Sequence, residues 1–263
     1  MFIIGYVAAA LIGISLGLIG GGGSILTVPV LVYLFGVSPV VASAYSLFIV
    51  GSTSLVGAVG KARQGLVSYK AVLYFGIPSL VAVFSTRKWI VPALPDTFFT
   101  LGSFALTKDI FTLLFFSVLM ILASISMIRN KVPDAEDNEI AIQPVRVALQ
   151  GIVTGLITGM VGAGGGFLIV PALILLLKLP VKKAMGSSLM IIAINSLIGF
   201  TGDLSNRDIE WTLILSIAAI AIAGIFAGNY FAKKVSASSL KKGFGWFVLA
   251  MGVYIIIKEL FLK

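Results

Sequence analysis

The sequence predicts an all-α, polytopic integral membrane protein built from two homologous halves, and three observations support this prediction. Of 263 residues, 59% are hydrophobic and only 11% are charged, whereas soluble domains carry about 25% charged residues. Such a chain cannot cover a globular surface with polar groups. Long apolar runs follow one another along the chain, and a glycine-rich pattern occurs twice.

The apolar runs form two groups of five. The first run lacks the basic region and cleavage site of a signal peptide, so we expect it to remain as a membrane segment. Most other runs are long enough to cross a hydrocarbon core of about 30 Å as helices, but two short ones would give only about 17 Å of helix. The runs are 1–19, 25–35, 40–59, 67–84 and 110–128, then 147–161, 167–177, 184–201, 209–232 and 244–262.

Charged residues divide the chain into three parts. Lys108 and Asp109 interrupt the last apolar stretch of the first group, and charges in hydrocarbon cost several kcal/mol. We therefore expect 96–109 to be an extramembrane loop or a surface helix, with the span starting at Ile110. The charge-rich stretch after this span is typical of a solvated linker. The predicted parts are a first membrane repeat (1–130), a polar cytoplasmic linker (131–144) and a second membrane repeat (145–263).

The two halves are related by a duplication. Aligning Pro29 with Pro171, an offset of 142 residues, matches 17 of 44 positions without a gap between 17–60 and 159–202. Several glycines, a proline and two serines match in register, which a shared apolar composition does not explain. A further shift of three residues also places Lys88-Trp89 on Lys233-Lys234. Internal repeats of this kind are a common build for transporters.

The short run in each half decides whether the halves are parallel or inverted. If it crosses, or forms a re-entrant hairpin with the run before it, each half has an odd number of segments and the halves are inverted. Thirteen Lys and Arg residues then lie on one face and six, including Arg87 and Lys88, on the other, and the positive-inside rule favours this asymmetry. We predict inverted halves of about five helical segments each, with both termini outside. The alternative is eight spans plus two re-entrant loops in parallel repeats.

Two glycine runs, Gly-Gly-Gly-Gly-Ser (20–24) and Gly-Ala-Gly-Gly-Gly (162–166), each precede a short helix that we expect to begin near Ile25 or Phe167. A helix start offers unpaired N–H groups and a partial positive charge, and glycine lets a ligand approach the backbone closely. Two such breaks facing each other at the bilayer midplane would bind an anion without a charged side chain. The alternative is close helix packing. The predicted substrate-binding residues here are Gly21, Gly22, Gly23, Ser24, Gly164, Gly165 and Gly166.

The helix after each short run carries hydroxyl groups and one amide. Ser46 and Thr53 are seven residues apart and share a helix face, as do Ser188 and Asn195, and the offset of 142 makes the two pairs equivalent. Neutral donors at matching positions suit an oxyanion that must bind and then leave. The alternative is that the hydroxyls satisfy backbone carbonyls. We predict that these four side chains complete the substrate site.

Other classes of function are disfavoured by what the chain lacks. It has no His and no Cys, which excludes most zinc sites, thiol chemistry and Ser-His-Asp triads. Asp203, Glu210 and Glu259 lie near segment ends, so no proton relay within an apolar run is evident. We expect no enzyme, no cofactor and no metal. The Lys and Arg residues behind the net charge of +9 lie between the apolar runs. This placement indicates topology signals and not a partner nucleic acid. The expected partners are a small anionic substrate, the lipid bilayer and a coupling ion, proton or sodium, with the chain a monomer or homodimer.

The doubled pattern Gly-Leu-Ile-Gly-Gly-Gly-Gly-Ser-x4-Pro (17–29) and Gly-Met-Val-Gly-Ala-Gly-Gly-Gly-x4-Pro (159–171) resembles the TauE/SafE family of sulfite-exporter-like permeases, and the resemblance covers nearly the whole chain. It implies a multi-pass protein of the cell (inner) membrane that transports a small sulfur-containing anion, such as sulfite or an organosulfonate, in either direction. Alternating access between the two halves would be the mechanism. The alternative on the same scaffold is a permease for a small organic carboxylate such as lactate.

Overall fold

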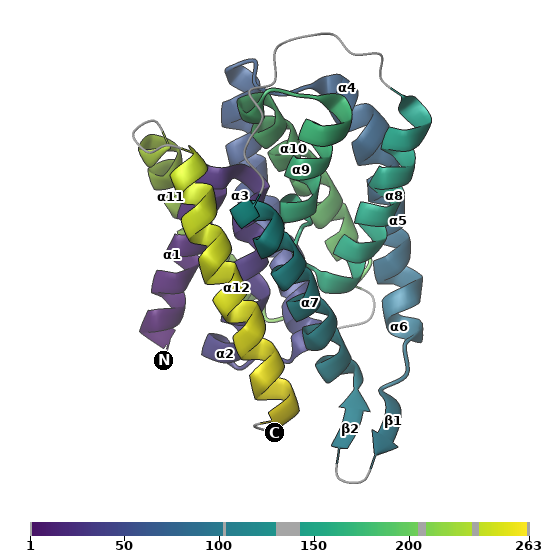
Figure 1. Cartoon of the computed structure of the whole chain (residues 1–263). Helices are drawn as coiled ribbons and strands as arrows, with labels where there is room; N and C mark the ends of the chain where they lie inside the picture. Colours follow the sequence, from purple (N-terminus) through teal and green to yellow (C-terminus); the bar gives the residue numbers. More distant parts are fainter. Residues whose placement is uncertain (1, 102–103, 130–142, 205–208, 233–236, 262–263) are drawn as a thin grey trace.

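The chain folds into a bundle of helices with one short β-hairpin at its lower end in Figure 1. The computed structural model describes residues 2–101, 104–129, 143–204, 209–232 and 237–261. Among these residues, eight helical segments are long and apolar enough to cross a bilayer. The predicted all-α, polytopic membrane fold is confirmed. The predicted linker 131–144 lies outside the described residues, except for its last two.

The first half begins with a helical hairpin. Helix α1 (Phe2–Ile19) continues through a 3-10 helix, η1 (Gly20–Leu26), into α2 (Thr27–Phe35). The rings of Tyr6 and Phe35 meet edge to face with centroids 5.5 Å apart, so α2 returns along α1. The elements that follow are α3 (Pro39–Arg63), the continuous stretch α4 (Tyr69–Ala71), η2 (Val72–Gly76), α5 (Ile77–Ser85), η3 (Thr86–Ile90) and α6 (Val91–Ala93), strands β1 (Thr97–Leu101) and β2 (Phe104–Thr107), and α7 (Lys108–Arg129).

The second half repeats this order with fewer interruptions. The short run predicted at 167–177 forms a helix of twelve residues, as the run at 25–35 forms α2. The elements of the second half are α8 (Pro144–Val161), α9 (Gly166–Leu177), α10 (Val181–Thr201), α11 (Trp211–Phe231) and α12 (Ala237–Phe261).

The segment before α7 differs from the prediction. Residues 96–109 were expected to form a loop or a surface helix, but β1 and β2 pair as an antiparallel hairpin and α7 starts at Lys108. The hairpin strands are rich in threonine and phenylalanine, which favour strands over helix. The two charges are held at this end of the bundle: Lys108 Nζ donates to the Leu94 carbonyl over 3.1 Å, and Asp109 Oδ1 accepts from the Val40 amide over 3.1 Å.

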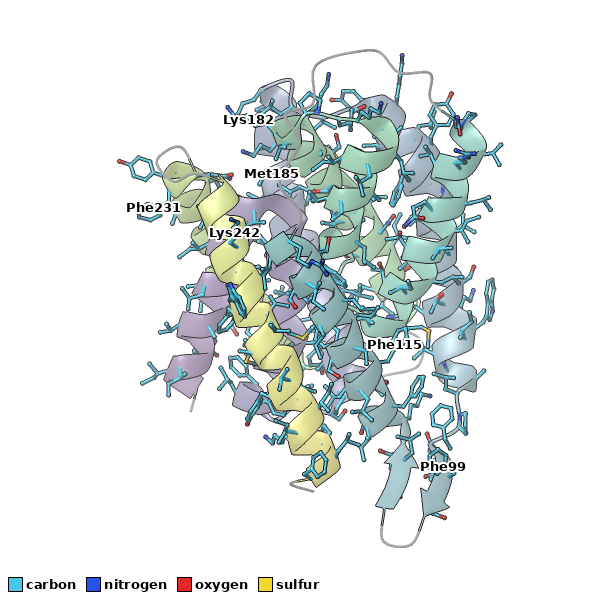
Figure 2. All side chains as sticks on the ribbon, viewed as in Figure 1. Phe99, Phe115, Lys182, Met185, Phe231 and Lys242 are labelled. Carbon is cyan, nitrogen blue, oxygen red and sulfur yellow. The ribbon has the colours of Figure 1, made fainter. Side chains whose placement is uncertain are left out.

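The bundle therefore has two distinguishable ends. We call the end with β1 and β2 the hairpin end and the opposite one the far end. Figure 2 shows Phe99 at the hairpin end and Lys182, at the start of α10, at the far end. Because the Val40 amide meets Asp109 beside the hairpin, α3 starts at the hairpin end and runs toward the far end.

The central helices are α3 and α10, which the offset of 142 residues makes equivalent. They are the most buried of the membrane-length helices. They run antiparallel, because Gly51 faces Leu197, whereas Gly57, further along α3, faces Leu189, earlier in α10.

The last helices of the halves, α7 and α12, are paired in the same way. Gly245 lies against Met127, and Gly252, two turns later in α12, lies against Met120, earlier in α7. Two pairs of equivalent helices thus lie side by side and run in opposite directions.

The first helix of each half packs on the third spanning helix of the other. Gly13 of α1 lies against the Ala221 carbonyl in α11, and Gly155 of α8 lies against the Ser79 carbonyl in α5. The offset of 142 converts one contact into the other. Glycines at these positions let the helix backbones touch, which is how membrane helices commonly associate.

The outer surface of the bundle is apolar. Large hydrophobic side chains are exposed on α1, α5, α7, α8, α11 and α12, with Ile3, Leu122, Phe226 and Trp246 all more than half exposed. An apolar surface of this extent on many helices is that of a protein surrounded by lipid.

Candidate functional site

The first glycine run is more ordered than the sequence predicted. Residues 20–26 form a buried 3-10 helix, so α2 begins at Thr27, two residues after the predicted Ile25. The Ser24 hydroxyl donates to the Gly21 carbonyl over 2.8 Å and does not cap α2. A 3-10 helix closes i to i+3 bonds, so this run presents a tight turn of small residues and not an open loop.

The second glycine run is an irregular turn between α8 and α9. Gly162, Gly164 and Gly165 have φ values of +75°, +67° and +69°, a left-handed conformation that residues with a Cβ rarely adopt. Helix α9 then begins at Gly166, close to the predicted Phe167.

The two runs meet at the backbone. A Cβ placed on Gly166 would overlap the Gly21 carbonyl, and a Cβ on Gly21 would overlap Gly166 and the side chain of Ile192. Gly164 lies against α3 and α10: its Cβ would be 2.7 Å from Val50 and 3.2 Å from Ser196 Oγ. The two glycine runs and the α3–α10 crossing therefore form one central region, which we call the glycine junction.

Other predicted glycines face their own half. A Cβ on Gly22 would approach Ile19 and Met127, and a Cβ on Gly23 would overlap the Ser15 hydroxyl. A Cβ on Gly165 would overlap Thr158. The structure thus brings Gly21, Gly164 and Gly166 to the glycine junction. Gly22, Gly23 and Gly165 lie outside it and face residues of their own half.

The predicted polar side chains of α3 and α10 are all buried. Thr53 donates to the Ile49 carbonyl over 2.7 Å, and Ser188 donates to the Met185 carbonyl over 2.8 Å. These two hydroxyls satisfy their own helices, as the alternative interpretation held. Asn195 Nδ2 donates to Ser79 Oγ over 2.8 Å, which ties α10 to α5.

Several other buried side-chain oxygens of α3 and α10 lack such a hydrogen bond. Within the described residues, Ser46, Ser54 and Ser196 Oγ and Asn195 Oδ1 make no hydrogen bond. Ser54 and Ser196 are equivalent through the offset of 142. Buried polar atoms are nearly always paired, so such a group calls for an explanation by ligand or water.

The sequence analysis missed the most buried charged side chain among the described residues. Arg87 is fully buried, and its Nε lies 3.1 Å from Asp203 Oδ2. Nη1 and Nη2 donate to Ser43 Oγ over 3.1 and 3.0 Å. The sequence analysis assigned Arg87 to the membrane face with six Lys and Arg residues and Asp203 to a position near a segment end. In the structure, the two side chains join the two halves inside the bundle.

The register of the repeat could have indicated that Arg87 is buried. The helix contact between Ser79 and Gly155 obeys the offset of 142. The three-residue shift that paired Lys88 with Lys233 is absent from this contact. Arg87 then corresponds to Asn229, which lies inside an apolar run. Arg87 also lies in η3, a π-helical turn, and an extra residue in a turn rotates the side chains that follow it, often at functional sites.

Two cavities lie between the hairpin end and Arg87. The outer one, which we call the vestibule, has a volume of about 300 Å³ and is lined by Ser38, Val40, Asp96, Thr107, Lys108 and Asp109. A small inner cavity of about 10 Å³ is lined by Ser43, Thr112 and apolar residues that include Val40 and Phe115, and Figure 2 labels Phe115 on α7. This inner cavity has room for about one water molecule.

A bundle of lipid-exposed helices whose two halves meet at broken, glycine-rich segments is the architecture of a membrane transporter. The chain belongs to the TauE/SafE family: the family model described as "Sulfite exporter TauE/SafE" matches residues 5–255. The family predicted from the doubled glycine pattern is confirmed, and the protein is a multi-pass membrane transporter.

Relatives of similar length share this description. A probable membrane transporter protein of Xylella fastidiosa strain 9a5c is 31% identical over 257 residues, covering 95% of this chain and 92% of the relative. The probable membrane transporter protein YunE of Bacillus subtilis is 27% identical and covers 99% of both chains. A probable membrane transporter protein of Methanocaldococcus jannaschii is 28% identical, covering 86% of this chain and 80% of the relative. No solved structure matches the chain.

Proposed function

We propose that this transporter carries a small sulfur-containing anion, such as sulfite or an organosulfonate, through the glycine junction. The observation that carries the proposal is the group of unpaired buried oxygens at Ser46, Ser54 and Ser196. Ser196 Oγ borders Gly164, so at least one of these hydroxyls lies at the second glycine run. A buried hydroxyl group that makes no other hydrogen bond can donate one to an anion.

The chemistry of the donors supports an oxyanion. The hydroxyls come from both α3 and α10, and at the second glycine run they border backbone that carries no side chain. Neutral donors bind an anion less tightly than a cation would, which suits a ligand that must be released. Sulfite and sulfonates carry three oxygen atoms on the charged group, whereas the carboxylate of lactate carries two, so donors from several elements favour the sulfur anions.

Alternating access between inverted halves is the proposed mechanism. Its support is the antiparallel pairing of the equivalent helices α3 and α10 and of α7 and α12. Figure 1 also shows α1 beginning and α12 ending at the lower end of the bundle. Rocking of one half against the other would open the glycine junction to each side in turn. We place the protein in the cell (inner) membrane as a monomer or homodimer, with 131–144 cytoplasmic and a proton or sodium as the coupling ion.

Ligand-dependent stability of the purified protein tests the substrate class. The ligands are sulfite, thiosulfate, sulfate, sulfoacetate, taurine and lactate, each with and without sodium. A ligand that binds the native state raises Tm by mass action, and we expect this for sulfite or a sulfonate. Stabilisation by lactate alone would favour the carboxylate alternative. No stabilisation by any sulfur anion, together with no uptake of sulfite into proteoliposomes, would reject the proposal.

A further inference from the structure

The burial of Arg87 inside this bundle costs desolvation free energy. Its side chain is fully buried, and Asp203 is 2% exposed. Charged side chains within membrane proteins are rare and usually belong to substrate or ion pathways. A buried ion pair is also a weak source of stability, because desolvation of both charges offsets their attraction.

The repeated scaffold does not require this ion pair. The offset of 142 places Asn229 at the position of Arg87, Lys61 at that of Asp203 and Met185 at that of Ser43. The packing follows the same rule, since Gly162 lies against Ser43 while Gly20 lies against Met185. A brace needed by the fold would be expected in both halves, whereas Asn229 and Lys61 cannot form the same ion pair at the equivalent place.

The guanidinium group has two differently occupied edges. Nε faces the carboxylate of Asp203, while Nη1 and Nη2 both donate to the one hydroxyl oxygen of Ser43. That hydroxyl also donates to the Val40 carbonyl over 2.7 Å. Guanidinium groups bind two oxygens of an oxyanion side by side, with stronger bonds than a shared neutral acceptor gives.

Ser43 connects Arg87 with both the access route and the glycine junction. Ser43 lines the inner cavity, which shares Val40 with the vestibule. The Ser43 carbonyl lies against Gly162, the first residue of the second glycine run. An anion that entered from the hairpin end by way of these cavities would therefore meet Ser43, and the Nη edge of Arg87 bonded to it, before it reached the glycine junction.

We propose that Arg87 is a substrate-binding and specificity-determining residue, whose Nη edge binds the oxyanion in place of Ser43 while Asp203 holds its Nε edge. This inference rests on the proposed transport of an oxyanion and adds a charged contact to it. Asp203 has a second effect, because its negative charge opposes the incoming anion and promotes release. The two members of the ion pair are thus expected to act on affinity in opposite directions.

Four variants test the inference by the dissociation constant of sulfite on purified protein. Removing both charges in Arg87→Gln/Asp203→Asn leaves no unpaired buried charge and is expected to weaken sulfite binding at least about tenfold. Asp203→Asn alone is expected to tighten binding. Arg87→Lys keeps the charge without the planar fork and should bind with intermediate affinity. The matched control is Lys88→Gln, which removes the adjacent, exposed cation over the rings of Phe84 and Trp89 and should bind as the wild type does.

The outcomes separate this inference from the proposed function. If the wild type binds sulfite and the double variant binds it equally well, the role of Arg87 is overturned and oxyanion transport stands. If the wild type binds no sulfur oxyanion, the proposed function fails and the inference fails with it. If the double variant does not fold, as judged by size-exclusion profile and Tm without ligand, Arg87→Lys decides, because it keeps the charge opposite Asp203: an affinity equal to that of the wild type contradicts the inference.

Discussion

Gly21 and Gly166 lie against each other so closely that neither has room for a side chain. They come from the two glycine runs, one in each half, and their contact brings the halves together at the centre of the bundle. The same contact gives the most direct test of whether the glycine junction must stay free of side chains.

We expect Gly166→Ala to reduce stability by about 1–3 kcal/mol, because its Cβ would overlap the Gly21 carbonyl. Transport should fall more than stability does, since the junction itself is displaced. The measurements are Tm and sulfite uptake into proteoliposomes. The control is Gly60→Ala, where nothing lies within 4 Å of the added Cβ and a helical alanine is expected to be neutral or stabilising. Wild-type stability and uptake in Gly166→Ala would show that the contact is dispensable.

Ser196→Ala is expected to lower sulfite affinity about fivefold, the value of one ordinary hydrogen bond. Stability should stay constant or rise, because the substitution removes a buried hydroxyl with no hydrogen bond among the described residues. The control is Ser117→Ala, where a buried hydroxyl of α7 donates to the Leu114 carbonyl over 2.7 Å, away from the glycine junction. A loss of stability in Ser196→Ala without a loss of affinity would mean that the hydroxyl serves packing alone.

Much of this architecture follows from the sequence. The apolar runs define the spans, and the doubled glycine pattern defines the repeat and the two breaks that meet at Gly21 and Gly166. The burial of Arg87 does not follow, because a cation at the end of an apolar run ordinarily lies at the membrane surface. Its charged neighbour there is Asp203, a residue of the other half that only the folded bundle brings within 3.1 Å.

The same limit applies to the hairpin end. Lys108 and Asp109 led to the expectation that 96–109 lies outside the membrane, but charge alone does not distinguish a loop from a pair of strands. The hairpin register, with Thr97 opposite Thr107, depends on which residues face each other across the turn. In the glycine runs, likewise, the sequence predicts where helices break but not that residues 20–26 form a 3-10 helix.

Asp109→Ala is expected to destabilise the protein by about 1 kcal/mol, the usual loss when a helix start loses its capping side chain. Asp109 Oδ1 accepts from the Val40 amide in the first turn of α3, and Ser38, which precedes α3, makes no side-chain cap. Asp109→Asn keeps an acceptor oxygen and should retain most of the stability. Thermal denaturation of the three proteins makes the comparison. Equal losses in both variants would indicate that the charge, and not the hydrogen bond, is what matters.

Inverted and parallel halves make opposite predictions for residues separated by the offset of 142. Gln64 follows α3 at the far end, while the Glu210 amide donates to the Tyr45 hydroxyl near the start of α3, toward the hairpin end. The equivalent of Glu210 in the first half is Ser68, four residues after Gln64. Inverted halves therefore place the two exposed side chains on opposite sides of the membrane, and parallel halves would place them on one side.

Because the chain has no cysteine, Gln64→Cys and Glu210→Cys each introduce a single target for a membrane-impermeant thiol reagent. We expect Glu210→Cys to label in intact cells and Gln64→Cys only after permeabilisation, because inverted halves place thirteen of the nineteen Lys and Arg residues on the Gln64 side. Each single-cysteine protein must also keep its sulfite uptake, which shows that the labelled chain is the folded transporter. Labelling of both positions from the same side would overturn the inverted arrangement, and with it alternating access between inverted halves.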